Sequence, residues 1–226
     1  KIEPISTQII PRDRHAHFFS VLGIIASSIE RFSVEIRNLQ RTEVAEVYEF
    51  FKKKQMGSSA MPHKKNPVLS ENLTGLARLI RSMVIPAMEN VALWHERDIS
   101  HSSVERNIGP DATVTLDFAL NRMSEVVNSM KINKNNMKKN LDLTKGLFFS
   151  QRVMLFLTEK GLKREVAYRI VQKCALRAID QNISFYDSLM EDKKIKDIIT
   201  VNNLKNLFDF GYHTKKINVI FSRVLK

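Results

Sequence analysis

The chain has 226 residues, a formal net charge of +12 at neutral pH, one cysteine, seven glycines and six prolines. This length suffices for one sizeable core, or for one large element with a small domain beside it. So few helix-breaking residues leave long uninterrupted segments, which argues against many short strands and predicts an all-α fold. A single cysteine, Cys174, excludes an internal disulfide and a multi-cysteine zinc site, and its apolar neighbours indicate an inert thiol in a helix core.

No run of residues approaches the length of apolar sequence that a membrane span needs, and residues 1–4 do not resemble a signal peptide. We therefore expect a cytoplasmic protein without a membrane partner. The positive charge is compatible with nucleic-acid binding, but the lysines concentrate only at 52–54 and 131–139 and are otherwise scattered. Solvated helix faces explain the same composition, and a positive surplus would also steer a phosphorylated dicarboxylate toward the protein.

The first predicted element is one long amphipathic helix over Arg14–Arg41, about 40 Å at the usual rise per residue. Its apolar positions recur in steps of three and four: Phe18, Val21 or Leu22, Ile25, Ile29, Phe32, Ile36 and Leu39. A second helix is expected from about Glu43 to Lys54, and it ends before a polar loop at 55–67.

The next helix is expected to begin at Asn66 and Pro67, which fit an N-cap and a first-turn position, and to be kinked or interrupted at Pro86. A further helix is predicted after Gly109–Asp111, running to about Met130. Residues 131–136 are polar and resemble a linker, and helical periodicity resumes in shorter pieces after Gly146.

These patterns predict part of a long-helix bundle at 1–137 and a small helical domain at 138–226. The apolar stripes of the long helices are broad, and few helices are available within one chain to cover them. Association with copies of the same chain would bury the remainder.

The loop at 57–67 carries the most chemical information in the sequence. It places two hydroxyls, an imidazole, two ammonium groups and an amide between Gly57 and Pro67, reading Gly-Ser-Ser-Ala-Met-Pro-His-Lys-Lys-Asn-Pro. So polar a segment contributes little to a core and is typical of a functional loop. Lys64 and Asn66 could hold a carboxylate, and a nearby hydroxyl could transfer a proton.

This loop resembles the signature of the fumarase, aspartase and argininosuccinate lyase superfamily, Gly-Ser-Ser-x-Met-Pro-x-Lys-x-Asn-Pro. Every fixed position of that pattern is present. The flanking segments resemble the adenylosuccinate lyases in particular: Ser6–Gln8, Arg12–His15, Trp94–Arg106 and, near the end of the chain, Gly146–Val153. The likeness therefore extends over nearly the whole chain.

The resemblance implies a homotetramer built around a twenty-helix bundle that releases fumarate by β-elimination. The expected substrates are adenylosuccinate, giving AMP, and succinylaminoimidazole carboxamide ribotide, giving AICAR, both in purine biosynthesis. It implies no metal and no organic cofactor. Argininosuccinate lyase is the nearest alternative, although its substrate carries no phosphate; a basic helical nucleic-acid-binding protein and a catalytically silent oligomerisation module are the others.

By the same resemblance Ser58 is the general base, with Ser59 as the neighbouring alternative and a substrate contact. Serine is a poor base unless cations and backbone N–H groups stabilise its alkoxide, and Lys64 is the nearest candidate for that role. Lys64 and Asn66 would also hold the fumaryl carboxylates, and Glu71 would pair with a catalytic histidine. Asn66 has a second interpretation as a helix cap, and Glu71 as a first-turn acid that complements the helix dipole.

A second set of predicted contacts is Arg97, Ser102 and Arg106, which by resemblance hold the nucleotide phosphate. Ser102 and Arg106 share a face if their segment is helical. Without the resemblance, the favoured explanation is a surface helix in which Arg97, Asp98, Glu105 and Arg106 form ion pairs. Gln8, which by resemblance hydrogen-bonds the substrate, is otherwise an ordinary loop glutamine.

His63, His95 and His101 lie inside these motifs, but none matches the general acid of the family. In the family the catalytic histidines precede the segment that matches Gln8. We therefore expect this chain to be the C-terminal part of a longer protein and to be nearly inactive alone. Because family sites draw residues from three subunits, the groups named above are not expected to converge within one chain.

Overall fold

The computed structural model describes residues 2–5, 7–51, 61, 63–95 and 98–225. It divides into two compact units, Lys1–Asn136 and Met137–Lys226, here called unit 1 and unit 2. The described secondary structure is helical except for two short strands that pair with each other. Among the described residues, no helix combines the length and apolar character needed to cross a membrane.

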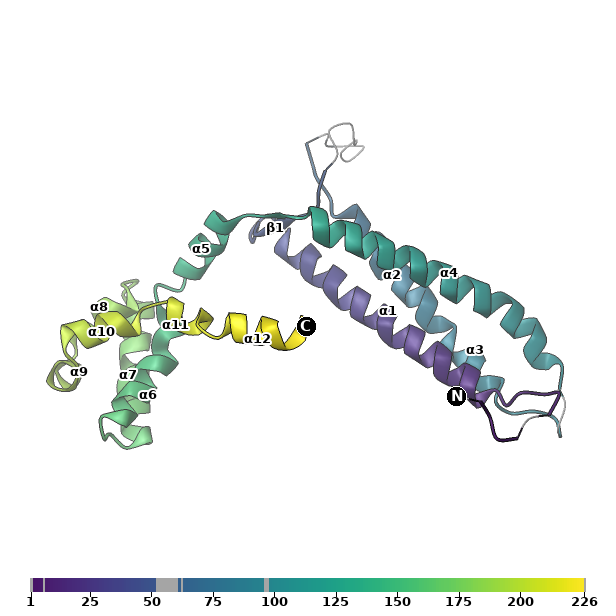
Figure 1. The fold of residues 1–226 in the computed structure, drawn as a ribbon. Helices are drawn as coiled ribbons and strands as arrows, with labels where there is room; N and C mark the ends of the chain where they lie inside the picture. Colours follow the sequence, from purple (N-terminus) through teal and green to yellow (C-terminus); the bar gives the residue numbers. More distant parts are fainter. Residues whose placement is uncertain (1, 6, 52–60, 62, 96–97, 226) are drawn as a thin grey trace. The chain divides into compact units, whose positions relative to one another are not determined.

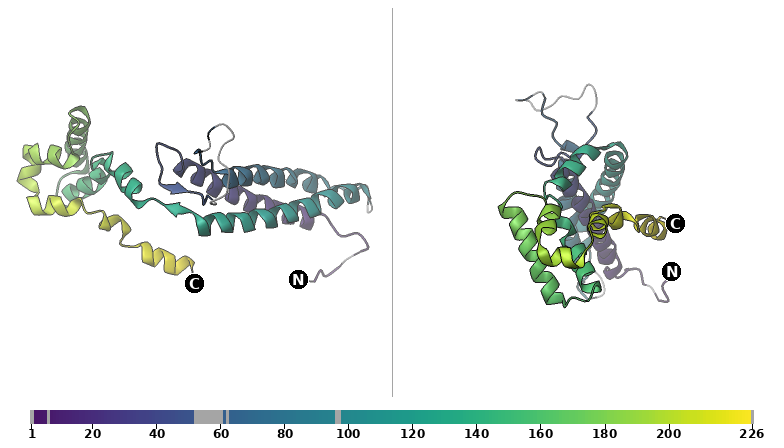
Figure 2. Two further views of the ribbon diagram at one scale, coloured as in Figure 1. Left: turned by 90° about the horizontal axis from the view of Figure 1, so that it is seen from above. Right: turned by 90° about the vertical axis from the view of Figure 1, so that its left-hand side faces the viewer.

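Unit 1 is built on three long helices that lie side by side, as Figure 1 and the left view of Figure 2 show. In chain order its elements are α1 (Asp13–Leu39), β1 (Val47–Tyr48), α2 (Val68–Ser82), α3 (Val84–Glu89), α4 (Ser100–Ser129) and β2 (Lys131–Ile132). An ion pair joins the start of α1 to the start of α4, and the strand that follows each helix pairs with the other, so α1 and α4 run parallel. The helix α2 runs in the opposite direction to α1 and α4.

The core of unit 1 combines branched apolar side chains with small ones, which lets the helices approach closely. Its most buried members come from all three long helices: Ala26, Leu73, Ala77, Ile80, Ala112 and Ala119. At Gly23 a methyl group would lie 2.8 Å from Val84 Cγ2, so this contact between α1 and α3 requires glycine. Between α1 and α2, Glu30 forms an ion pair with Arg81 at 2.6 Å.

The long first helix is confirmed, and part of its expected face is buried, namely Leu22, Ile29 and Ile36. Other positions of the expected face are not buried. Phe18 and Phe32 are 48% and 62% exposed, whereas Phe19 next to the first of them is 5% exposed. The buried stripe instead uses small residues as well, among them Ala26 and Ser33. The periodicity alone could not distinguish a wide apolar face from the narrower part of it that is covered within the chain.

The expected helix from Glu43 to Lys54 is wrong for its described part; Lys52–Lys54 lie outside the described residues. Residues 41–44 form a turn, Ala45 has a positive φ of 53°, and Val47 and Tyr48 pair antiparallel with Ile132 and Lys131. The same pairing corrects the linker expected at 131–136, because β2 and the start of α5 (Lys134–Asp142) occupy it. A two-residue ladder between segments so distant in sequence leaves no local signal.

Two helix starts also differ from the prediction. The helix α4 begins at Ser100 and continues through Gly109 and Pro110, because Ile108 and Ala112 on either side of the proline are both buried against the neighbouring helices. The helix α2 begins at Val68 with Pro67 in the N-cap position, so Asn66 is not its cap. The predicted interruption near Pro86 is confirmed, since α2 ends at Ser82 and Pro86 lies in the first turn of α3.

Unit 2 is a cluster of short helices around a second core. After α5 come a 3-10 turn (Leu147–Phe149), α6 (Ser150–Glu159), α7 (Arg164–Asp180), α8 (Phe185–Glu191), α9 (Lys193–Ile198), α10 (Val201–Leu207), α11 (Gly211–Thr214) and α12 (Ile217–Val224). Phe185 and Leu189 are fully buried in the middle of this core. Cys174 is buried there as expected, and burial raises the pKa of its thiol.

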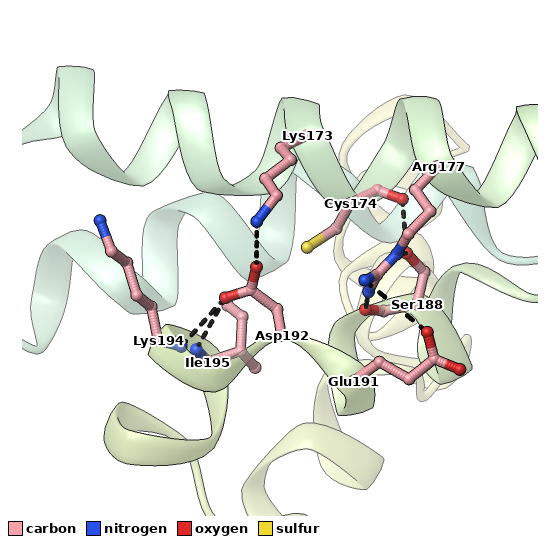
Figure 3. A network of polar contacts seen from close by, with 8 residues as sticks. All are labelled: Lys173, Cys174, Arg177, Ser188, Glu191, Asp192, Lys194 and Ile195. Carbon is pink, nitrogen blue, oxygen red and sulfur yellow. Dashed lines mark hydrogen bonds and ion pairs between the residues drawn. The ribbon is translucent and has the colours of Figure 1, made fainter.

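Polar contacts fix the junction between α7, α8 and α9 (Figure 3). The Ser188 hydroxyl donates to Cys174 O at 2.7 Å, and Arg177 donates to both the hydroxyl and the carbonyl of Ser188. The Asp192 carboxylate caps α9 by accepting from Lys194 N at 3.0 Å, and it pairs with Lys173 at 3.1 Å. Side-chain caps of this kind define where the short helices begin.

Candidate active site

A cleft of about 960 Å³ opens in unit 1 beside the C-terminal end of α1. Its walls come from the last turns of α1, the turn after it, β1, and the segment that leads into α2. The predicted residues Lys64, Asn66 and Glu71 all line this cleft. The structure therefore brings to one cleft three groups that lie within eight positions of one another in the sequence.

Local backbone contacts set the positions of these three groups. Lys64 N donates to Met61 O at 2.9 Å, which forms a turn, and Val68 N donates to Asn66 O at 2.9 Å directly before α2. Glu71 lies in the first turn of α2, where a negative charge complements the helix dipole. Asn66 and Glu71 thus flank the start of one helix and share one cleft wall.

The described lining is rich in cations. Arg37 on α1 and Arg41 in the turn after it lie in the same lining as Lys64 and Lys65. Arg37 donates to Thr74 Oγ1 at 3.4 Å, and Arg41 is paired with Glu43 at 3.0 Å on the surface. Among the described lining residues Glu71 is the carboxylate, so the cleft suits an anionic ligand such as a dicarboxylate.

Several lining groups were not anticipated from the sequence. Gln40, Arg37 and Tyr48 line the cleft. Glu49 lies outside the lining and accepts a hydrogen bond from Ser70 N, next to the lining residue Glu71. Arg37 gave no separate signal, because cations in a last helical turn are common for dipole reasons alone. The roles predicted for Ser58, Ser59 and Arg97 fall on positions that lie outside the described residues.

The predicted phosphate contacts lie at the other end of unit 1, on the first turns of α4. Arg106 Nε donates to Ser102 Oγ at 3.2 Å, so these two side chains share a helix face as expected. The alternative of local pairing between Glu105 and Arg106 is not what forms, because Glu105 accepts from Arg12 Nε at 2.7 Å. Gln8 is exposed in the segment that leads to Arg12 at this same end.

The start of α4 is further ordered by Asp98. Its carboxylate accepts from the backbone N–H of Ser100 at 2.8 Å, and this bond, with the Ser100 hydroxyl, lowers the pKa of Asp98. The Asp98 carboxylate therefore stabilises the start of α4. Ser102 is half-buried in this first turn, and Arg106 is exposed one turn after it.

The two groups of predicted residues are far apart in the chain's own fold. They lie near opposite ends of α1, whose 27 residues correspond to about 40 Å. A nucleotide that carries a succinyl group is much shorter than this distance. A single copy of the described residues therefore does not bring the predicted carboxylate contacts and the predicted phosphate contacts together.

The described residues offer no group of three or more histidine, cysteine, aspartate or glutamate side chains suited to a metal ion. The cleft is instead built from ammonium, guanidinium, amide and carboxylate groups. Such groups can bind a polyanion and stabilise charge that develops on it.

Comparison with known proteins supplies the family. Residues 1–81 match the family described as Lyase, and residues 146–224 match the family described as Adenylosuccinate lyase C-terminus. The adenylosuccinate lyase of Thermotoga maritima is 57% identical over 226 residues, which is 100% of this chain and 52% of that protein. The adenylosuccinate lyase of Bacillus subtilis is 51% identical over 224 residues, which is 99% of this chain and 52% of that protein. This chain belongs to the adenylosuccinate lyase family.

The chain spans about half the length of the curated adenylosuccinate lyases that it matches. Among solved structures, the 3-carboxy-cis,cis-muconate lactonizing enzyme of Pseudomonas putida has a TM-score of 0.82 and 29% identity, over 94% of this chain and 47% of that one. A fumarate lyase of Mesorhizobium sp. BNC1 has a TM-score of 0.77 at 21% identity over 88% of this chain and 43% of that one, which supports the fold alone. The all-α fold of this chain is thus shared with these two solved structures.

Proposed function

We propose that this chain provides part of the active site of an adenylosuccinate lyase, which eliminates fumarate from adenylosuccinate to leave AMP. The same chemistry would convert succinylaminoimidazole carboxamide ribotide to AICAR. The observation that carries the proposal is the cationic cleft in which Lys64, Asn66 and Glu71 meet, in a chain 57% identical to an adenylosuccinate lyase.

Elimination requires three events. A base removes a proton from the succinyl carbon beside one carboxylate, the electron pair forms the new C=C bond, and the bond from the adjacent carbon to nitrogen breaks. The nitrogen keeps that electron pair and takes up a proton. We assign the first step to Ser58, with Ser59 beside it, and the stabilisation of the charge on the carboxylate to Lys64 and Asn66.

Glu71 is assigned to a histidine from elsewhere in the assembly, whose tautomer and basicity a carboxylate would set. Ser102, Arg106 and Arg97 would bind the phosphate, since guanidinium groups match phosphate oxygens in pairs. Gln8 would contact the succinyl or amide portion of the substrate.

The separation of these groups along α1 supports a site shared between copies of the chain, and we propose a homotetramer in the cytoplasm. Apolar side chains on the long helices provide surface for such contacts: Phe18, Ile24, Phe32, Val114 and Phe118 are exposed within the chain. Light scattering of the full-length protein measures the oligomeric state directly, and a monomer with full activity would contradict the shared site.

The activity is tested by offering the full-length protein adenylosuccinate and argininosuccinate separately and following fumarate. Release from adenylosuccinate alone is expected, because argininosuccinate lacks the phosphate for Ser102 and Arg106. The variant Ser58→Ala should lose orders of magnitude in kcat with oligomer and fold unchanged. Fumarate release only from argininosuccinate would overturn the assignment, and wild-type turnover by Ser58→Ala would remove that serine from its role.

A further inference from the structure

The helix α2, which carries one wall of the cleft, begins without a cap of its own. The first N–H groups of a helix have no partner within the helix and need acceptors from elsewhere. Pro67 in the N-cap position provides no side-chain acceptor. The acceptor comes instead from Glu49, whose carboxylate receives Leu69 N at 3.1 Å, Ser70 N at 2.7 Å and the Ser70 hydroxyl.

The backbone of Glu49 is in turn hydrogen-bonded to Gln40, the residue that follows α1. Glu49 N donates to Gln40 Oε1 at 2.9 Å, while Gln40 Nε2 donates to Lys65 O at 2.9 Å. Gln40 is the C-cap residue of α1 and lines the cleft. The pair Gln40 and Glu49, here called the clasp, therefore ties together the end of α1, the segment after β1, and the segment that enters α2.

Two of the residues bonded by the clasp, Lys65 and Ser70, lie next to the predicted cleft groups in the chain. Lys65, whose carbonyl accepts from Gln40, stands between Lys64 and Asn66 in the chain. Ser70, which donates to Glu49 through both its N–H and its hydroxyl, immediately precedes Glu71. The clasp side chains thus fix the backbone at the two points from which the three cleft groups extend.

We propose that Gln40 and Glu49 are positioning residues, which hold the segment 64–71 against α1 so that Lys64, Asn66 and Glu71 face the substrate. This inference rests on the proposed lyase function. The clasp does not support the bundle as a whole, because α2 is anchored by Leu73, Ala77 and Ile80 in the core of unit 1. Its loss should therefore displace the cleft groups while the bundle stays folded, and displacements of about 1 Å can lower a rate about a hundredfold.

Two variants of the full-length protein test the proposal. Glu49→Gln keeps the size of the side chain but leaves one of the two N–H groups of α2 facing an amide NH₂. Gln40→Met keeps the length and removes both hydrogen bonds. We expect each to lower kcat for adenylosuccinate about ten- to a hundredfold at 25 °C, with the oligomer intact. The double variant should be little worse than the poorer single variant, because both changes open one clasp.

Asp192→Asn in unit 2 is the matched control. Asp192 also caps a helix by accepting from two backbone N–H groups, those of Lys194 and Ile195, but it is remote in sequence from the cleft. This variant should lower the unfolding temperature while kcat stays at the wild-type value. A role of Glu49 in stability alone would give the same pattern for Glu49→Gln.

The outcomes separate the two proposals. Wild-type kcat in both clasp variants, with a lowered unfolding temperature, would overturn the positioning role and leave the lyase function standing. A wild-type protein that releases no fumarate from adenylosuccinate would overturn both. If Glu49→Gln does not fold, the kcat of Gln40→Met decides the question alone.

Discussion

The contact between Arg12 and Glu105 links the start of α1 to the helix that carries Ser102 and Arg106, and it should stabilise that end of unit 1. The Arg12 Nε to Glu105 Oε1 distance is 2.7 Å, and the two side chains are 12% and 25% exposed. The His15 Nδ1 atom lies 3.7 Å from the same carboxylate oxygen. Replacing Arg12 by Met and Glu105 by Gln removes the charges with little change in size.

The expected magnitude follows from distance and burial. Two unit charges at 2.7 Å attract each other by about 6 kcal/mol at an effective dielectric constant of about 20. Removing the two groups from water offsets much of this attraction. Exposed pairs contribute at most about 1 kcal/mol and breaking a fully buried pair costs about 3 to 5 kcal/mol, so partial burial places the coupling at about 1 to 3 kcal/mol.

A double-mutant cycle measures this coupling from urea denaturation of the wild type, Arg12→Met, Glu105→Gln and the double variant. The pair of Arg14 and Glu3 is the matched control. Its N–O distance is 2.6 Å, but its side chains are 45% and 44% exposed, so solvent and salt screen it. The coupling of Arg12 and Glu105 should persist in high salt, and that of Arg14 and Glu3 should be too small to resolve.

Equal couplings for the two pairs, or a coupling of Arg12 with Glu105 that salt abolishes, would refute this reasoning. Either result would mean that burial does not decide the strength of these contacts. The attachment of α4 to α1 would then have to depend on apolar packing alone.

Two further predictions concern unit 2 and the contact between α1 and α3. Burial alone would raise the pKa of Asp192, but hydrogen bonds from Lys173 and two backbone N–H groups lower it overall. The stabilising contribution of Asp192 is therefore complete above its ordinary pKa of about 4 and is lost as pH falls through the lower pKa of the folded state. When urea midpoints are measured from pH 6 to 3, the midpoint of Asp192→Asn should fall less with decreasing pH than that of the wild type. Gly23→Ala should destabilise the protein by about 1 to 3 kcal/mol through its clash with Val84, and Val84→Ala should restore much of the loss, whereas Gly75→Ala, which meets nothing within 4 Å, should be neutral or stabilising. Thermal unfolding that ranks Gly75→Ala below Gly23→Ala would contradict the packing argument.

Sequence periodicity correctly predicted helices that make many packing contacts along their whole length. The long apolar pattern of α1 and the break near Pro86 were both predictable, because each depends on local sequence. Lys64, Asn66 and Glu71 were singled out by their resemblance to the family, and because they are close in sequence they line one cleft. Features of the fold that depend on local sequence could therefore be predicted from the sequence.

The failures have a common physical origin in contacts between distant segments. A turn and a strand replace the helix expected from Glu43, because Val47 pairs with Ile132 in the antiparallel ladder. Asn66 has the residue type of a cap, yet the cap of α2 comes from Glu49, 21 positions before Ser70. Pro110 lies inside a helix because the packing of its neighbours outweighs one missing hydrogen bond.

The pairing of β1 with β2 also bears on the order in which unit 1 forms. Contacts between α1 and α2 close short stretches of chain, as where Arg37 meets Thr74 at a separation of 37 positions. The contacts beside the strands close much longer ones, as where Asn136 donates to Ala45 O across 91 positions. Long closures form late and short ladders open readily, so amide hydrogens around β1 should exchange sooner than those in the middle of α1 and α2. The cleft wall beside β1 would then open and close locally while the helices of the bundle stay folded, which would let a ligand enter the cleft.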